Sequence, residues 1–149
     1  TPGLINRQFD EDIVLGDSRS RDIYLMESAI WLKNNEESAY LVGDPAVFDI
    51  YSGFYEFDVA TDYETVRVYL GKEEDLDFIL KSEIVFGNYE HTMTRNRMDY
   101  LIINEAVFTY PSFLFDKPLN HDVKDKFDNR TELNKVYDNM KIQIYKNLS

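Results

Sequence analysis

The hydrophobic positions of this chain follow two different spacings, which predict where helices and strands lie. Apolar residues three and four positions apart are typical of an amphipathic helix, whereas alternation or a short unbroken apolar run is typical of a β-strand. Helical spacing is clearest from Ser20 to Asn34. The apolar residues expected on its buried face are Ile23, Met26, Ala29 and Ile30, with Trp31 beside them.

Shorter apolar segments predict an alternation of strands and helices along the rest of the chain. The unbroken run from Tyr100 to Ile103, in a strand predicted from Asp99, is typical of a central strand buried on both faces. The segment from Thr65 to Leu70 is ambiguous, because its β-branched residues favour a strand while its position allows a helix. The other strands are expected over residues 38–42, 56–60 and 83–86, and the other helices over 45–53, 72–81 and part of 118–129.

The end of the chain, from Glu132 to Asn147, predicts a β-hairpin. Val136, Ile142 and Ile144 alternate with polar residues, and Asp138-Asn139 lies at the turn. Asp and Asn suit this place because they tolerate the left-handed backbone of tight turns.

Strands that alternate with helices predict an α/β fold. We expect a single layered, Rossmann-like domain over residues 18–149, with a mixed sheet because the C-terminal hairpin adds antiparallel strands. Residues 1–17 are polar and irregular, so a linker or lead-in is expected there. The chain begins at Thr1 rather than Met, and we therefore expect a piece of a longer protein.

Charge and composition exclude several classes of partner and site. A formal net charge of -12 repels nucleic acids and anionic lipid surfaces, because phosphate binding requires clustered Lys and Arg. The 149 residues include no Cys, which excludes disulfides, thiolate zinc sites and a Cys nucleophile. No run approaches the roughly 20 apolar residues of a membrane-spanning helix.

Polar side chains follow three of the predicted strands at the points where the strands end. Asp44, Asp62 and the pair Asn104-Glu105 occupy these positions. If the strands are parallel neighbours, the four side chains meet at one edge of the sheet, where ligands bind in open α/β sheets. Asp44 and Asp62 also suit helix caps. The edge is therefore the candidate ligand site, with capping as the alternative.

Motifs that would indicate catalysis, a cofactor or a metal are missing from the sequence. There is no Gly-x-Ser-x-Gly elbow, no HxxxH pair and no glycine-rich phosphate loop, so no catalytic residue and no cofactor are assigned. The acids Asp122, Asp125 and Asp128 lack the spacing of a calcium loop, and no metal site is expected. His91 and His121 are expected in surface loops.

Two triplets fit the acceptor pattern for N-glycosylation. They begin at Asn129 and Asn147, and they agree with an extracytoplasmic location. Arg95 and Arg97 form the closest arginine pair, which suits an anion but is expected to flank the central strand as solvated charges.

Two segments resemble a family of membrane proteins. The segment from Asn134 to Tyr145 looks like the closing pattern Lys-Val-Tyr-Asp-Asn-Gly, then Val-x-Ile-Tyr, of soluble C-terminal domains in large archaeal multi-pass membrane proteins, which include relatives of lipid-linked-sugar glycosyltransferases. The segment Trp31-Leu32-Lys33-Asn34-Asn35 is similar to their Trp-Leu-Lys-x-Asn helix, which precedes a strand ending in Asp, here Asp44. Met140 departs from the pattern, in which Gly is usual at this place.

The resemblance implies a parent protein in the cell membrane, with this domain on the extracytoplasmic side. In the glycosyltransferase relatives the catalytic acids lie in membrane-embedded loops outside such a domain, so no catalytic residue carries over. We therefore expect a non-catalytic domain that docks to its parent membrane region or contacts glycans of the cell envelope. A small-molecule or sugar-binding module at the strand-end edge is the second hypothesis, and an acid-dependent hydrolase using two of the edge acids is the third.

Overall fold

A seven-stranded mixed sheet organises the protein, in the order β4-β3-β2-β1-β5-β7-β6. The computed structural model describes residues 18–112 and 114–149, so the lead-in expected over residues 1–17 lies outside the described residues. The strands are β1 (Tyr40–Val42), β2 (Asp58–Ala60), β3 (Glu83–Gly87), β4 (Met93–Arg97), β5 (Tyr100–Asn104), β6 (Leu133–Asp138) and β7 (Ile142–Asn147).

The central strands of this sheet are parallel and the outer ones are antiparallel. β1 pairs in parallel with both β2 and β5. The β3–β4 hairpin adds to β2, and the β6–β7 hairpin adds to β5, each in antiparallel orientation. The predicted α/β class, mixed sheet and C-terminal hairpin are therefore confirmed.

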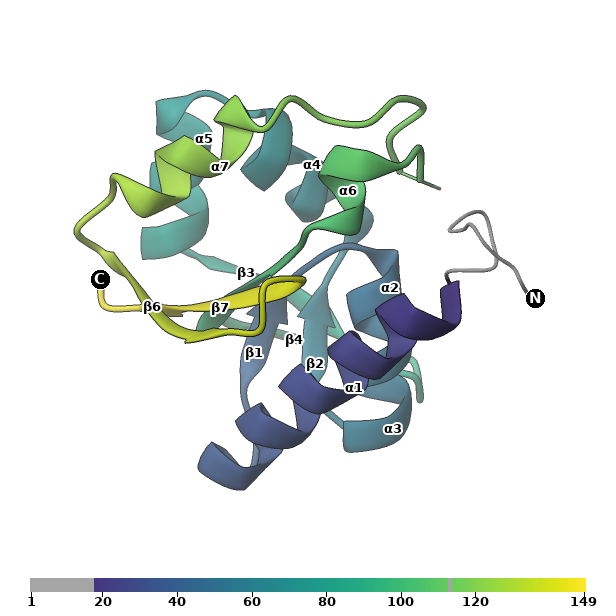
Figure 1. Cartoon of the computed structure of the whole chain (residues 1–149). Coiled ribbons are helices and arrows are strands. Elements are labelled where there is room, and N and C mark those ends of the chain that lie inside the picture. The colour runs from purple at the N-terminus through teal and green to yellow at the C-terminus, as the bar shows by residue number, and fades with distance from the viewer. Residues whose placement is uncertain (1–17, 113) are drawn as a thin grey trace.

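Helices cover both faces of the sheet (Figure 1). One layer contains α4 (Asp62–Leu70), α5 (Glu73–Lys81), α6 (Ala106–Thr109) and α7 (Asp122–Asp128). The other layer contains α1 (Ser18–Asn35) and a helical segment in which a π-helical turn, η1 (Phe48–Ser52), joins the short helices α2 (Pro45–Val47) and α3 (Gly53–Tyr55).

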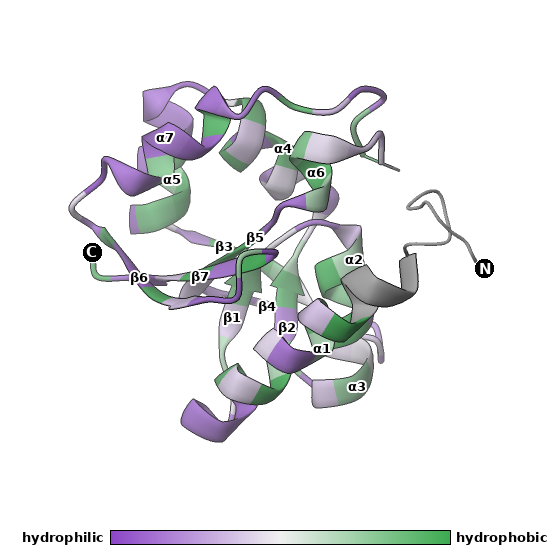
Figure 2. Ribbon diagram, viewed as in Figure 1, coloured by the Kyte–Doolittle hydropathy of each residue, from purple (hydrophilic) through white to green (hydrophobic). Residues whose placement is uncertain are grey.

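Each face of the sheet packs against its own helix layer, so two hydrophobic cores lie back to back. Leu41 and Ile102 belong to the core beneath α1 and η1. Val42, Leu101 and Ile103 belong to the core beneath the other layer. This alternation follows the two-residue period of a strand, and it explains why β5 is buried throughout. In Figure 2, hydrophobic colour appears in the central strands and in parts of the helices, whereas α7 is largely hydrophilic.

The prediction of which face of α1 is buried is wrong. Ile23, Met26 and Ile30 are 61%, 37% and 46% exposed. The side chains that pack inward are Leu25, Ser28, Ala29 and Leu32, of which only Ala29 was expected. The buried face includes a polar residue because the Ser28 and Tyr51 hydroxyls share a hydrogen bond of 2.7 Å. A hydroxyl whose hydrogen bonds are satisfied is tolerated in a core. Because Ser28 is polar, the spacing of apolar residues alone does not identify the buried face of α1.

In two further segments, the tertiary context determines the secondary structure. The ambiguous run from Thr65 to Leu70 is helical, because Val68 and Tyr69 are buried against the sheet within α4. Strand β4 is not predicted by the pattern, since Met-Thr-Arg-Asn-Arg has no apolar alternation. Among the described strands, β4 lies at the sheet edge and pairs with β3 alone, so it can remain polar.

Candidate ligand-binding groove

The carboxyl ends of the three parallel strands lie at one edge of the sheet. Asp44 follows β1 and Asn104 ends β5, and Asn104 Nδ2 donates a hydrogen bond to Asp44 Oδ2 across 3.4 Å. The two residues are only 5% and 4% exposed. Two of the four residues singled out from the sequence therefore meet, but they meet inside the protein.

The Asp44 carboxyl lies in an unfavourable place for a charge. Burial raises its pKa from 3.8 to about 6, against the opposing effects of the Val47 backbone and the Asn104 amide. Within the described part of the chain, Asp44 Oδ1 and the Tyr69 hydroxyl are both buried without a hydrogen-bond partner. Burial also raises the pKa of Tyr69 well above its usual value, and the charge of Asp44 adds to this effect. Asp44 stands at the N-cap position of α2 but makes no side-chain capping bond.

Glu105, the residue after β5, has a partner of its own. Its Oε2 accepts a hydrogen bond from Lys124 Nζ at 2.5 Å, and both side chains are mostly buried. Lys124 belongs to α7, so this ion pair fastens α7 to the end of β5. Glu105 is therefore held in a structural contact and does not join the Asp44–Asn104 pair.

Asp62 lies apart from these residues, at the first position of α4. The N-cap residue of α4 is Thr61, so Asp62 does not cap the helix. Its exposed side chain instead lines a surface groove. The four residues are thus divided among a buried pair, an ion pair and a groove.

The groove opens between η1 and the β3–β4 hairpin and has a volume of about 330 Å³. Its apolar lining comes from Phe48, Val59, Ala60 and Met93. Its polar lining comes from Asp49, Thr61, Asp62, Asn88 and His91. Small-molecule sites commonly combine an apolar surface with a few polar groups in this way.

The tip of the β3–β4 hairpin forms one wall of the groove through local hydrogen bonds. Asn88 Oδ1 accepts from the backbone N–H groups of Glu90 and Thr92, at 3.0 and 3.2 Å. Asn88 Nδ2 donates to Asp58 Oδ1 at 3.1 Å, which ties the tip to the start of β2. His91 adopts a left-handed backbone with φ of 63°, which lets the chain turn back into β4. Asn88 therefore holds the wall in shape while His91 completes it.

The opposite wall is the π-helical turn η1. Ser52, its last residue, is buried and accepts a hydrogen bond from the Tyr89 backbone at 2.9 Å, so the two walls are joined. π-helical turns are rare and frequently occur at functional sites. In this protein η1 contributes Phe48 and Asp49 to the groove.

Three of the polar groove residues are free to meet a ligand. Asp49, Asp62 and His91 are exposed. Across residues 18–112 and 114–149, their side chains make no ion pair or hydrogen bond with the protein. Among the described residues that line the groove none is Lys or Arg, and the ionisable side chains there are those of Asp49, Asp62 and His91.

Most groove residues could not be identified from the sequence. Asp62 was identified because it follows a strand, but Phe48, Asp49 and Met93 come from segments far from it in the chain. His91 was expected to be a surface loop residue, and it is exposed in a loop. The one local signal was the polar run Asn88 to Thr92, which is typical of a turn.

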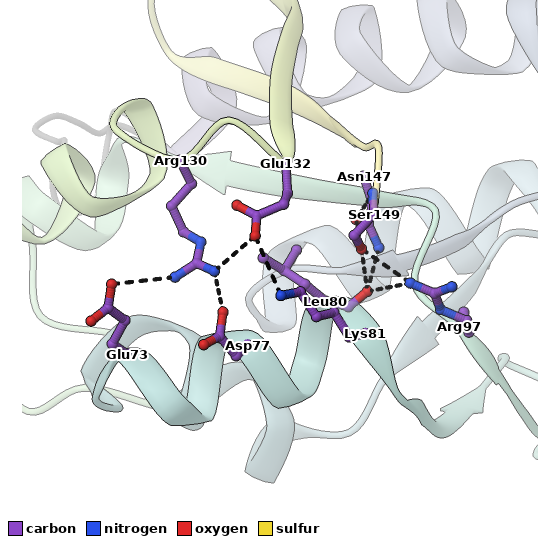
Figure 3. A network of polar contacts seen from close by, with 9 residues as sticks. All are labelled: Glu73, Asp77, Leu80, Lys81, Arg97, Arg130, Glu132, Asn147 and Ser149. Carbon is purple, nitrogen blue, oxygen red and sulfur yellow. Dashed lines mark hydrogen bonds and ion pairs between the residues drawn. The ribbon is translucent and has the colours of Figure 1, made fainter.

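A polar network outside the groove ties the C-terminal strand to α5 (Figure 3). The Leu80 carbonyl oxygen accepts hydrogen bonds from Arg97 Nη2, Asn147 Nδ2 and Ser149 Oγ, at 2.9, 2.9 and 2.7 Å. In the same view, Arg130 forms ion pairs with Glu73, Asp77 and Glu132. Arg97 is thus engaged by the protein itself.

The two glycosylation triplets lie in different environments. Asn129 is exposed after α7. Asn147 Nδ2, the atom that would carry a glycan, donates to Leu80 O at 2.9 Å and to Met98 O at 2.8 Å. A glycan at Asn147 would replace one of the two Nδ2 hydrogens, so at least one of these bonds would be lost.

Searches for recognisable sites and relatives give negative results. Of the helices in the described part of the chain, none has the length and apolar character needed to cross a membrane. Among the described residues, no group of three or more His, Asp or Glu side chains could hold a metal ion. Comparison with protein-family models, curated proteins and solved structures finds no match to this chain.

Proposed function

We propose that this chain is a non-catalytic glycan-binding part of the extracytoplasmic side of a multi-pass membrane protein, and that its sugar ligand binds in the groove beside Asp62. The observation that carries the proposal is the groove itself, in which exposed and unpaired polar groups surround an apolar surface.

The lining of the groove suits a sugar. A sugar ring presents C–H groups on one face and hydroxyls around its rim, so it needs apolar contact and hydrogen-bonding partners together. Phe48 and Met93 supply apolar surface, while Asp49 and Asp62 supply acceptors for hydroxyls. The volume of about 330 Å³ is at the small end of ligand sites, which fits a monosaccharide or disaccharide.

Binding without hydrolysis agrees with the position of Asp44, whose carboxyl pKa is raised by burial to about 6. Asp44 is 5% exposed and does not line the groove. A general acid must reach the atom that it protonates, whereas the buried Asp44 carboxyl accepts a hydrogen bond from Asn104. The acid with the raised pKa is therefore not one of the residues that line the groove.

A membrane parent is supported by the resemblance of two segments to the archaeal membrane proteins. Those segments pack together, since the rings of Trp31 and Tyr137 have centroids 5.0 Å apart. Asn139 Nδ2 also donates to the Tyr24 carbonyl at 3.1 Å. The resemblance thus involves one packed unit, in which α1 meets the C-terminal hairpin.

Amide NMR spectra recorded during titration with cellobiose, maltose and N-acetylchitobiose test the proposal. We expect saturable shifts at Asp49, Asp62 and His91, and Phe48→Ala should weaken binding while the spectrum remains that of a folded protein. Phe54→Ala is the matched control, because Phe54 is 67% exposed and does not line the groove. Shifts that avoid the groove with every disaccharide would contradict the proposal.

A further inference from the structure

We infer that the groove prefers a sugar carrying a protonated amine, an amino sugar, over a neutral or an acidic sugar. This inference rests on the proposed function, since it names the ligand class of the same groove. It follows from the charges that line the groove and from their lack of partners within the protein.

Two carboxylates line the groove. Asp49 of η1 and Asp62 of α4 both line it, and both are exposed. The acids that surround Arg130 and Lys124 are neutralised by ion pairs. By contrast, Asp49 and Asp62 form no ion pair among the described residues, and the described lining of the groove contains His91 but no Lys or Arg.

An ammonium group would supply the missing cation. Carboxylates only accept hydrogen bonds, whereas an ammonium group only donates them, so the two are complementary. Hydrogen bonds between charged partners are stronger than those between neutral groups. N-acetylation would remove this charge from the sugar, and a uronic acid would place a third carboxylate beside the two that are already present.

The expected preference is modest because both carboxylates are exposed. An exposed ion pair contributes up to about 1 kcal/mol, which corresponds to about a fivefold difference in Kd. Added salt should reduce this preference, because it screens exposed charges.

Titrations with two disaccharides of the same size and with a small diamine test the inference. The disaccharide of β-1,4-linked glucosamine should bind about fivefold more tightly than cellobiose, which has the same ring skeleton without the amine. In an Asp49→Asn/Asp62→Asn double variant, the ratio of the two Kd values should fall toward one. Asp125→Asn is the control, because Asp125 is an exposed acid of α7 that does not line the groove, and it should keep the ratio. The third probe, 1,4-diaminobutane, carries ammonium groups without a sugar ring and should bind more weakly than the amino sugar.

The outcomes separate the inference from the proposed function. Equal Kd values for the amino sugar and cellobiose, with shifts in the groove, would overturn the inference and leave a sugar-binding groove in place. A preference that survives in the double variant would overturn the inference as well, because the amine would then bind elsewhere on the acidic surface. Diaminobutane binding in the groove while cellobiose does not bind would overturn both.

Discussion

Asn104 Nδ2 donates a hydrogen bond to Asp44 Oδ2 across 3.4 Å and joins the ends of β5 and β1 inside the protein. The pair lies where adjacent parallel strands lead to helices on opposite faces, since β1 continues into α2 and β5 into α6. Ligands commonly bind at such points. In this protein the point is closed by the protein's own side chains, and the open groove lies one strand further along, beside β2.

Asp44 should make the free energy of unfolding depend on pH. Because its pKa is about 6 in the folded protein and 3.8 without burial, the folded protein binds the proton more tightly than the unfolded chain does. Its contribution to stability is therefore present at low pH and is lost between about pH 4 and pH 6. A difference of about two pKa units corresponds to about 3 kcal/mol.

The variant Asp44→Asn isolates this contribution. Relative to the wild type, it should gain up to about 3 kcal/mol between pH 4 and pH 8, because Asn does not ionise. Urea unfolding of both proteins at the two pH values measures the difference. A constant difference between the two proteins would show that Asp44 keeps an ordinary pKa.

The network at Leu80 O predicts a loss of stability in Asn147→Ala. This change removes the donor of two hydrogen bonds, to Leu80 O and Met98 O, near the end of β7. We expect a loss of about 1–3 kcal/mol, because the Met98 carbonyl oxygen loses this donor and the Leu80 carbonyl oxygen loses one of its three donors. Asn134→Ala is the control, since Asn134 is exposed on β6 and its side chain makes no hydrogen bond among the described residues. Urea unfolding measures both variants, and equal effects would refute this account of the network.

The turn of the C-terminal hairpin predicts a stabilising change. Met140 has φ of 77° and is 83% exposed, so it bears the cost of a left-handed backbone without gaining burial. Met140→Gly should raise the free energy of unfolding by about 0.5–1 kcal/mol, because glycine adopts this conformation without steric cost. Lys141→Gly should lower it, since Lys141 does not have positive φ. Thermal unfolding followed by circular dichroism compares the two, and a lower melting temperature for Met140→Gly would count against the explanation.

The spacing of hydrophobic residues predicted the helices and strands that depend on local sequence. It failed where contacts with residues distant in the sequence determine which side chains are buried. The unbroken apolar run of β5 and the alternation in the C-terminal hairpin identified both elements. The alternation did not show that β7 is buried on both faces, because Gln143 is polar. The buried face of α1 was mistaken because Ser28 is satisfied by Tyr51, which is 23 residues away.

The candidate ligand site was also predicted only in part, because the local sequence does not show contacts between distant segments. Strand ends identified Asp44 and Asn104, which do meet, and Asp62, which lines the groove. Glu105 was expected at the same site, but it forms an ion pair with Lys124 of α7, a contact that strand-end position does not indicate. The rest of the groove is assembled from η1 and a hairpin that includes the unpredicted strand β4, so no local pattern marks it.

The presence of a sugar in the groove is tested most directly by a crystal structure of the chain grown with a saturating concentration of the β-1,4-linked glucosamine disaccharide. We expect electron density for the sugar between Phe48 and His91, with its amine within hydrogen-bonding distance of Asp49 or Asp62. Density for the sugar at the Asp44–Asn104 pair, or an empty groove in crystals that leave it open to solvent, would contradict this expectation.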